Sequence, residues 1–308
     1  ALLLCSIQIS GMLGFAIAPA LLPAFIADWS LTNTQGGILA GALLAGYMCA
    51  VPVLVSLTDR VDARRVYVAS AAATALALAG FAILADGFPS AVAFQFLAGA
   101  GLAGTYMPGL KLLSDRIGGP RQSRYISFYT SSFSIGAALS YFAGGAIGAE
   151  LGWRWAAGLG AVGAFAASAG VALLVRDGAS RPDPTAARMP LFDFRPVLRA
   201  RATMSYVLGY TAHMFELFAL RGIHVFISGT ALRGWLVAFL VFAQPGPATV
   251  ATYASATLLA AVVNLLGLPA SVAGNELALR YGRRRVVLTI MLLSCLAACG
   301  VGFASGLS

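Results

Sequence analysis

Charged side chains are scarce in this sequence, and their scarcity excludes most soluble proteins. They make up 10% of the 308 residues, whereas hydrophobic residues make up 59%, and the mean hydropathy is +0.85. A soluble domain usually carries about 25% charged residues. So few charges cannot cover a water-exposed surface, and we expect contact with lipid to replace the missing polar surface.

Residues that carry metal, redox or covalent chemistry are equally scarce. The chain has two His residues and four cysteines. The cysteines lie in apolar stretches without a C-x-x-C pair, which is typical of small packing residues. Neither H-E-x-x-H nor G-x-x-x-x-G-K-[ST] occurs. We therefore expect no cofactor, no metal and neither enzymatic nor ATP-driven activity. The cysteines are Cys5, Cys49, Cys295 and Cys299.

Long apolar runs recur along the chain with short polar breaks between them. Crossing the hydrocarbon core takes about 20 helical residues, and backbone that faces lipid must satisfy its own hydrogen bonds, which favours helices. The sequence therefore predicts an all-α, polytopic membrane helix bundle with nine transmembrane helices. They are expected at residues 3–27, 35–57, 66–86, 91–113, 125–149, 155–175, 202–243, 248–272 and 286–306.

The basic residues mark the ends of these segments. All but three of the 20 Lys and Arg residues lie in four polar stretches, 58–65, 111–124, 176–201 and 280–285. Cytoplasmic loops are enriched in such residues, so the pattern places these stretches and the N-terminus on the cytoplasmic side. No basic face is left over for nucleic acid. The high Ala and Gly content and the single lysine, Lys111, favour a bacterial plasma membrane.

The segment 202–243 is too long for one crossing, because a helix of that length would reach about 63 Å. It contains a short repeat, in which Ala-Leu-Arg-Gly occurs at 219–222 and again at 231–234. An insertion of one repeat, seated as a break or re-entrant turn, accounts for the excess. A long kinked helix that protrudes from the membrane is the alternative.

Small residues and prolines punctuate the predicted helices. Gly46 and Gly99 lie in the second and fourth spans, where small residues let helix backbones approach closely. Pro19 and Pro23 are expected to bend the first span, and Pro108 the fourth. Broken helices often mark transport paths.

The loop after the second predicted helix carries a family pattern. The pattern reads G-x-L-a-D-R-x-G-R-R; Asp59 and Arg60 match it, while Val55 and Asp62 replace its glycines. It recurs after the eighth predicted helix, where Leu279 replaces the acidic residue. Two such loops in equivalent positions make the chain resemble the major facilitator superfamily of secondary transporters. The residues that match in the second loop are Leu277, Ala278, Arg280, Gly282, Arg283 and Arg284.

Other helices carry weaker versions of the family's motifs. The fourth helix often reads R-x-x-x-G-x-G, and here Gln95 replaces the arginine that precedes Gly99, so no role of that arginine can be carried over. In the fifth helix, Ser140 and Tyr141 replace a glycine and the proline of the antiporter motif, which counts against an antiporter. The sequence Gly-Trp-Arg-Trp at 152–155 is also common in the family.

The resemblance implies two helical bundles joined by a cytoplasmic loop. Residues 1–175 would form the six-helix N-terminal bundle, 176–201 the loop, and 202–308 part of a second bundle that lacks helices 10 to 12, as in a fragment. It also implies a monomeric secondary active transporter in the lipid bilayer that moves a small-molecule substrate by alternating access, coupled to an ion, for which we expect the proton. A non-transporting membrane scaffold, a channel or a membrane-embedded enzyme are the alternatives.

The resemblance further implies a gating role for the two arginine-rich loops. A carboxylate such as Asp59 can cap a neighbouring helix and pair with arginines, and this contact would hold the cytoplasmic side closed. A solvated charge cluster that only sets topology is the alternative. The residues of this gating loop and of its repeat are Asp59, Arg60, Arg64, Glu276, Arg280, Arg283 and Arg284.

Ionisable side chains inside the seventh predicted span are the best candidates for a substrate or proton site, because such residues are costly in a membrane. His213 and Glu216 are spaced to share one helical face. A His changes charge near neutral pH, and a buried Glu can relay a proton. Tyr210 and Arg221 lie on the same span. A satisfied pair that only fixes helix packing is the alternative.

The resemblance places helices 1, 4, 7 and 10 around a central cavity, which adds weaker candidates. Gln8 lies in the first span, and Tyr106 and Lys111 lie in the fourth. Lys111 is close to the cytoplasmic end of its helix and can simply extend its ammonium group to the interface.

Overall fold

The computed structural model describes two compact units, and helix is the only regular secondary structure among the residues that it describes. The units comprise residues 1–191 with 250–272, and residues 192–249 with 273–308. The described residues are 1–119, 122–176, 195–201, 203–205, 207–209, 211, 250–282, 284–290 and 292–293. The expectation of an all-α architecture is therefore confirmed over the described part.

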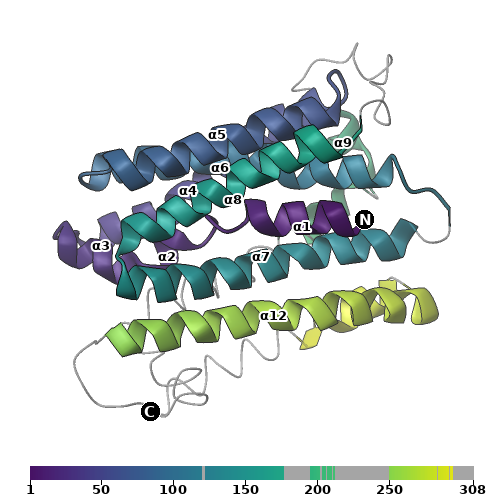
Figure 1. Cartoon of the computed structure of the whole chain (residues 1–308). Coiled ribbons are helices and arrows are strands. Elements are labelled where there is room, and N and C mark those ends of the chain that lie inside the picture. Colours follow the sequence, from purple (N-terminus) through teal and green to yellow (C-terminus); the bar gives the residue numbers. More distant parts are fainter. Residues whose placement is uncertain are drawn as a thin grey trace. The chain divides into compact units, whose positions relative to one another are not determined.

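Five long helices dominate the first unit (Figure 1). Each lies within a few residues of a predicted span, because lipid requires an apolar run of nearly fixed length. Helix α5 packs against both α6 and α8, and α6 also packs against α4. The helices are α4 (Asn33–Leu57), α5 (Ala63–Leu84), α6 (Phe88–Ser114), α7 (Gln122–Glu150) and α8 (Trp153–Leu174).

The first span is not the single helix that residues 3–27 predict. It consists of α1 (Leu2–Gly11), α2 (Ile17–Ala20) and α3 (Leu22–Asp28). Pro19 lies inside α2 and has no N–H to give to the carbonyl of Phe15, and Pro23 likewise leaves the carbonyl of Pro19 without its helical donor. The prolines therefore signal the breaks, but each break lies a few residues before its proline.

Close backbone contact joins α4 to α6, as the glycines predict. A Cβ atom built on Gly46 would lie 2.7 Å from the carbonyl carbon of Phe96, and one built on Gly99 would lie 2.7 Å from that of Leu43. Each distance is shorter than any real Cβ contact, so only glycine fits at both positions. The two pairs also show that α4 and α6 run antiparallel. Pro108 lies inside α6, which continues through it to Ser114.

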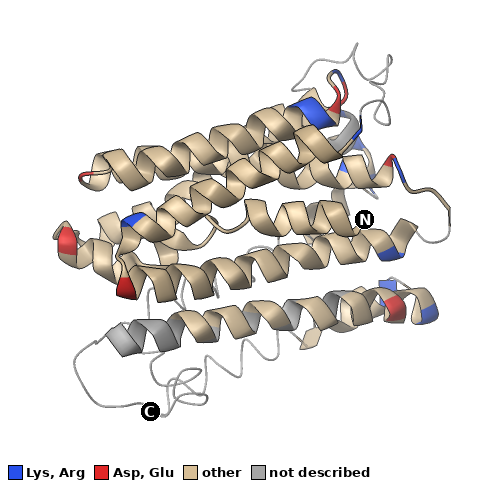
Figure 2. Cartoon of the chain, in the orientation of Figure 1, with Lys and Arg blue, Asp and Glu red and all other residues tan. Residues whose placement is uncertain are grey.

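Four helices of the described part, α4, α5, α7 and α8, are long and apolar enough to cross a membrane by length and composition. In the described part of the first unit, charged side chains lie at helix ends and the stretches between them are uncharged (Figure 2). Large apolar side chains point outward from α5 and α8, where lipid would cover them. Examples are Leu76, Ile83, Val162, Phe165 and Leu173.

Later parts of the chain are described only in segments. Helix α9 (Arg195–Arg199) falls within the stretch predicted as a loop, and α12 (Val250–Tyr281) begins near the predicted span 248–272 but ends nine residues later. The extension follows from helix-forming residues after 272, and Gly282, with φ of 88°, ends the helix in the left-handed conformation that favours glycine. The repeat at 219–234 lies outside the described residues.

Candidate functional site

A buried polar cluster links three helices of the first unit. Gln8 of α1 is 1% exposed, and the Tyr129 hydroxyl of α7 lies 3.0 Å from its Oε1 atom and 3.2 Å from the carbonyl oxygen of Tyr106 in α6. The rings of Tyr106 and Tyr129 stack, with centroids 5.8 Å apart. Two of the predicted candidates, Gln8 and Tyr106, are therefore brought together by a residue that the sequence did not single out.

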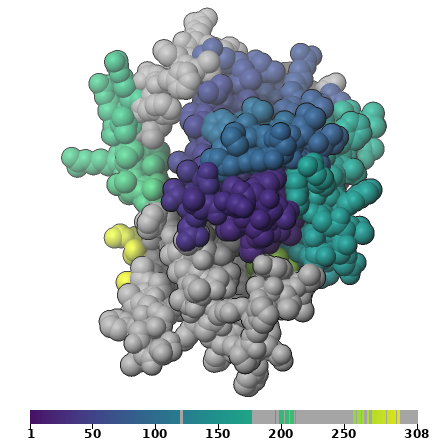
Figure 3. All heavy atoms as spheres, turned by 90° about the vertical axis from the view of Figure 1, so that its left-hand side faces the viewer, coloured from purple at the N-terminus to yellow at the C-terminus, as the bar shows by residue number. Residues whose placement is uncertain are grey.

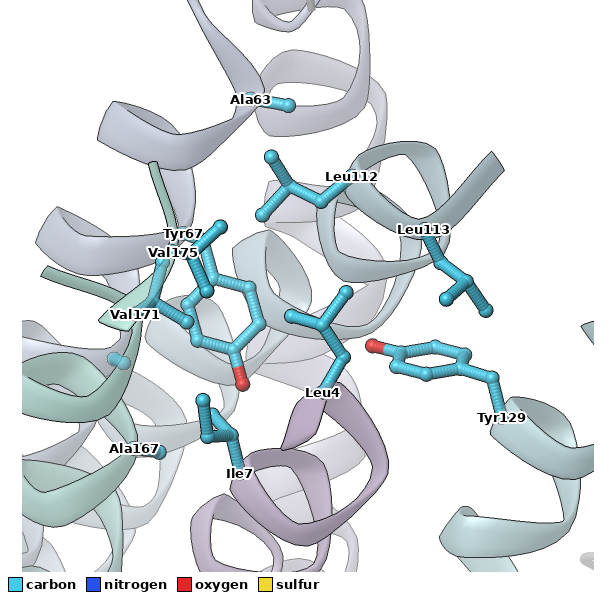
Figure 4. Packing of buried hydrophobic residues seen from close by; sticks show 11 residues of the cluster. Leu4, Ile7, Ala63, Tyr67, Leu112, Leu113, Tyr129, Ala167, Val171 and Val175 are labelled. Carbon is cyan, nitrogen blue, oxygen red and sulfur yellow. The ribbon is translucent and has the colours of Figure 1, made fainter. Parts of the chain in front are cut away.

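The Tyr129 hydroxyl has one hydrogen and two acceptors within reach. When it donates to Tyr106, Gln8 can instead donate to it through the amide nitrogen after the amide turns over. The cluster thus has two hydrogen-bonded arrangements without moving the backbone. Figure 4 shows the surroundings, in which the hydroxyl groups of Tyr67 and Tyr129 point toward the side chains of Leu4 and Ile7. The hydroxyl groups are enclosed by apolar side chains, which strengthens each hydrogen bond.

A single hydroxyl group holds the break in the first span. Ser140 of α7 is fully buried, accepts a hydrogen bond from the Ala16 N–H at 2.9 Å, and donates to the Leu13 carbonyl at 2.7 Å. Non-helical backbone is stable at membrane depth only where such groups are satisfied inside the protein. Sequence comparison noted Ser140 only as a departure from a glycine motif, since its partners lie more than 120 residues away.

The first arginine-rich loop forms caps at the end of the bundle. Asp62 accepts from the Arg64 N–H at 2.7 Å and so caps α5. The Arg64 guanidinium donates to the carbonyls of Val171 and Ala172 at the end of α8. Asp59 lies in the turn after α4. The residue that caps α5 is therefore Asp62, to which the sequence pattern gave no role, and a gating role for Asp59, Arg60 and Arg64 stays a prediction.

Arg154 forms the matching contact at the opposite end. It donates to the carbonyls of Ala82 at 2.8 Å and Ala85 at 3.0 Å, and its guanidinium lies 4.5 Å from the ring centre of Trp153. The sequence could have pointed to this contact, because Arg154 is a lone charged residue between two tryptophans. Beside it, an aromatic cluster closes this end of the bundle; its members are Phe25, Trp29, Phe81 and Trp153.

The other candidates have no described hydrogen bond to this cluster or lie outside the described residues. Lys111 pairs with Asp115 at 3.9 Å in the last turn of α6. Glu276 and Arg280 lie one turn apart near the end of α12, and Arg284 begins the next helical segment. The candidates outside the described residues are Tyr210, His213, Glu216, Arg221 and Arg283.

Comparison with known proteins shows which family the chain belongs to. The sequence profile described as "Major Facilitator Superfamily" matches residues 3–308. The chain belongs to the major facilitator superfamily. The multi-pass, all-helical membrane architecture follows from this membership.

Two plant proteins give a narrower likeness. Residues of this chain are 27% identical over 129 positions to the "Probable sphingolipid transporter spinster homolog 1" of Arabidopsis thaliana, and 26% identical over 127 positions to homolog 2. The first match covers 42% of this chain and 26% of the plant protein, so the chain aligns with about a quarter of that relative.

Solved structures share the fold of this chain. The crystal structure of a bacterial homolog to the human lysosomal transporter Spinster, inward-facing and unoccupied, superposes with a TM-score of 0.60 at 16% identity. The match covers 95% of this chain and 78% of that one. The occupied form of the bacterial homolog gives a TM-score of 0.57.

Proposed function

We propose that this superfamily member is a secondary active transporter that moves a small solute by alternating access. The observation that carries the proposal is the broken first span, whose non-helical backbone is buried and held by Ser140. Interrupted helices next to buried polar groups are typical of transport paths in secondary transporters. The cluster of Gln8, Tyr106 and Tyr129 supplies uncharged polar groups beside that path.

The proposed cycle requires two helical bundles and a contact that opens and closes one side. Residues 1–175 and 202–308 are the bundles, joined by 176–201. The arginine-rich loops carry the gate: Asp59, Arg60 and Arg64 in the first, with Glu276, Arg280, Arg283 and Arg284 in the repeat. This gate faces the cytoplasm, as does the N-terminus, because the basic residues gather there.

Proton coupling is proposed for the seventh span. His213 and Glu216 share one helical face, with Tyr210 and Arg221 on the same span. A carboxylate buried in a membrane binds a proton more readily than one in water, so Glu216 is suited to take up a proton when the solute leaves. The relatives named for sphingolipid transport make a sphingolipid the first solute to test. We propose a monomer in a plasma membrane.

Flux in liposomes tests both parts of this proposal. Purified protein is reconstituted in liposomes and given a fluorescent sphingolipid and small polar solutes in turn. One of these classes should accumulate faster under a pH gradient than without it. Glu216→Gln should abolish the gradient-driven component, whereas Glu150→Gln, a control at the end of α7, should retain it. Equal flux with and without the gradient would remove the coupling, and no flux of any solute would favour a scaffold.

A further inference from the structure

Gln95 of α6 is a buried amide without a partner. Its residue is 0% exposed, and neither its Nε2 nor its Oε1 atom makes a hydrogen bond with the described part of the chain. The amide can donate two hydrogen bonds and accept two more. Buried polar groups are almost always hydrogen-bonded, so an amide with both atoms unsatisfied calls for a bound group to complete it.

The face of α6 that carries Gln95 points into the first unit. Ala91, Gln95, Ala98 and Leu102 follow the helical spacing of one stripe, and each is 5% exposed or less. Three members of this stripe are apolar, so the amide is the polar exception in a packed surface. Its position cannot be explained by contact with lipid headgroups or water at the surface.

The surroundings of this face join α6 to three other elements. Ala98, one turn from Gln95, packs with Leu78 of α5 and Ala161 of α8. A side chain on Gly14, in the break of the first span, would clash with Leu78. Seen end-on, the N-terminal segment in purple lies against the blue region of α5 and α6 and the teal region of α7 and α8 (Figure 3). Gln95 thus lies about one turn from the point where the break meets these helices.

The stretch of α6 that carries Gln95 holds no charged side chain between Phe88 and Leu110. In the described part of the first unit, charged side chains lie at helix ends. Asp86 lies nine residues before Gln95, about 14 Å along the axis, and the Arg154 guanidinium at that end of the bundle is bound to the carbonyls of Ala82 and Ala85. A charged ligand would be costly at Gln95 without a countercharge, whereas a neutral group that both donates and accepts matches the amide.

We propose that Gln95 is a hydrogen-bonding subsite for an uncharged polar group, a hydroxyl or amide, bound inside the first unit. Two sources supply this chemistry: the headgroup of a transported solute, in which case the inference rests on the proposed function, and a water molecule. Gln95 is then a ligand-contacting residue of the N-terminal bundle, separate from the cluster of Gln8 and Tyr129.

The melting temperature of the protein in nanodiscs tells whether the Gln95 amide has a hydrogen-bonding partner or has none. Gln95→Met keeps the length of the side chain and removes both polar atoms, and Leu102→Met on the same stripe is the matched control. If a group is bound, Gln95→Met should lower the melting temperature by about 2–6 °C, while the control changes it by about 1 °C. An orphaned amide predicts the opposite sign, because Met would then remove unsatisfied atoms.

Thiol labelling gives a second readout that does not depend on transport. In protein whose four cysteines are replaced by Ala, Gln95→Cys should react with methyl methanethiosulfonate about tenfold faster than Ala98→Cys, because a hydrated site stabilises the reactive thiolate. Both positions are 0% exposed, so burial alone predicts equal rates.

A diol lipid distinguishes the two sources. With 1-monooctanoylglycerol, a rise in the melting temperature of the wild type that is lost in Gln95→Met assigns the subsite to a solute hydroxyl, and octanoate should give no such difference. No rise in either protein, together with destabilisation by Gln95→Met and fast labelling, assigns it to water. A more stable Gln95→Met protein with labelling no faster than at Ala98→Cys overturns the proposal, whatever the flux assay gives.

Discussion

Arg64 at the start of α5 and Arg154 at the start of α8 each donate hydrogen bonds to the last carbonyl groups of the other's helix. The two helices pack side by side, and because the start of each contacts the end of the other they run in opposite directions. Each arginine therefore donates to carbonyls in the last turn of a helix, although the Val171 carbonyl also accepts from the Val175 N–H. Each also places its positive charge at the negative end of a helix dipole. The pair fixes the relative height of α5 and α8 from both ends.

Replacing Arg154 should loosen this pair. We expect Arg154→Met to lower the free energy of unfolding by about 1–2 kcal/mol, because the carbonyls of Ala82, Ile83 and Ala85 lose a charged donor. Arg154→Lys should recover part of the loss, since it keeps the charge but not the planar fork. Unfolding in detergent, followed by circular dichroism, measures both. Arg65→Met, at an exposed arginine next to Arg64, is the control and should change little; an equal loss there would refute the specific contact.

Removing the Ser140 hydroxyl should destabilise the break in the first span. Ser140→Ala leaves the Ala16 N–H and the Leu13 carbonyl without this partner, and we expect a loss of about 1–3 kcal/mol. Ser132→Ala is the matched control, because the buried Ser132 hydroxyl donates to the Tyr129 carbonyl of its own helix. Chemical denaturation of both variants gives the comparison. Equal losses in the two variants would contradict a special role for Ser140.

The contact between α4 and α6 makes a sharp steric prediction. Gly46→Ala should cost more than about 2 kcal/mol, since the new methyl group meets the backbone of Phe96 and neither helix can yield locally. Gly41→Ala, on the same helix with no atom within 4 Å of the new Cβ, should stabilise the protein by about 0.5–1 kcal/mol. Yield of folded protein by size exclusion and melting temperature report the difference. Similar behaviour of the two variants would mean that the helices are not in backbone contact.

A double-mutant cycle should detect the buried hydrogen bond between Gln8 and Tyr129. Gln8→Met and Tyr129→Phe are expected to couple by about 0.5–1.5 kcal/mol in unfolding free energy. Gln8→Met combined with Ser90→Ala provides the uncoupled reference, because Ser90 lies sixteen residues before Tyr106, about 24 Å along α6, and bonds Asp86. This cycle should be additive within about 0.5 kcal/mol. Additivity in both cycles would show that the Tyr129 hydroxyl donates to Tyr106 alone.

The long helices could be predicted from the sequence because one physical requirement determines them. Lipid tolerates only apolar, internally bonded segments, so the predicted span 35–57 lies within two residues of α4 (Asn33–Leu57). The break in the first span could not be predicted in this way, because it is stabilised by the Ser140 hydroxyl group of α7. Proline indicated where the helix weakens, but only the tertiary partner determines where it stops.

Some residues of the candidate site could likewise be predicted from the sequence, and others could not. Gln8 and Tyr106 could be named because a polar residue in an apolar run stands out. Tyr129 could not, because a tyrosine in a span is compatible with either packing or hydrogen bonding until its neighbours are known. Asp62 shows a further limit: a motif drew attention to Asp59, while the local cap of α5 falls on the carboxylate that immediately precedes the helix.

The serine that bridges α7 to the interrupted first segment also constrains how this sequence can diverge. A homologue with alanine at the position of Ser140 would lose the bridge, and its first segment would gain by becoming one uninterrupted helix. Position 140 and residues 13–19 should therefore change together across descendants of a common ancestor. Lineages that keep the serine should also keep the proline at position 19.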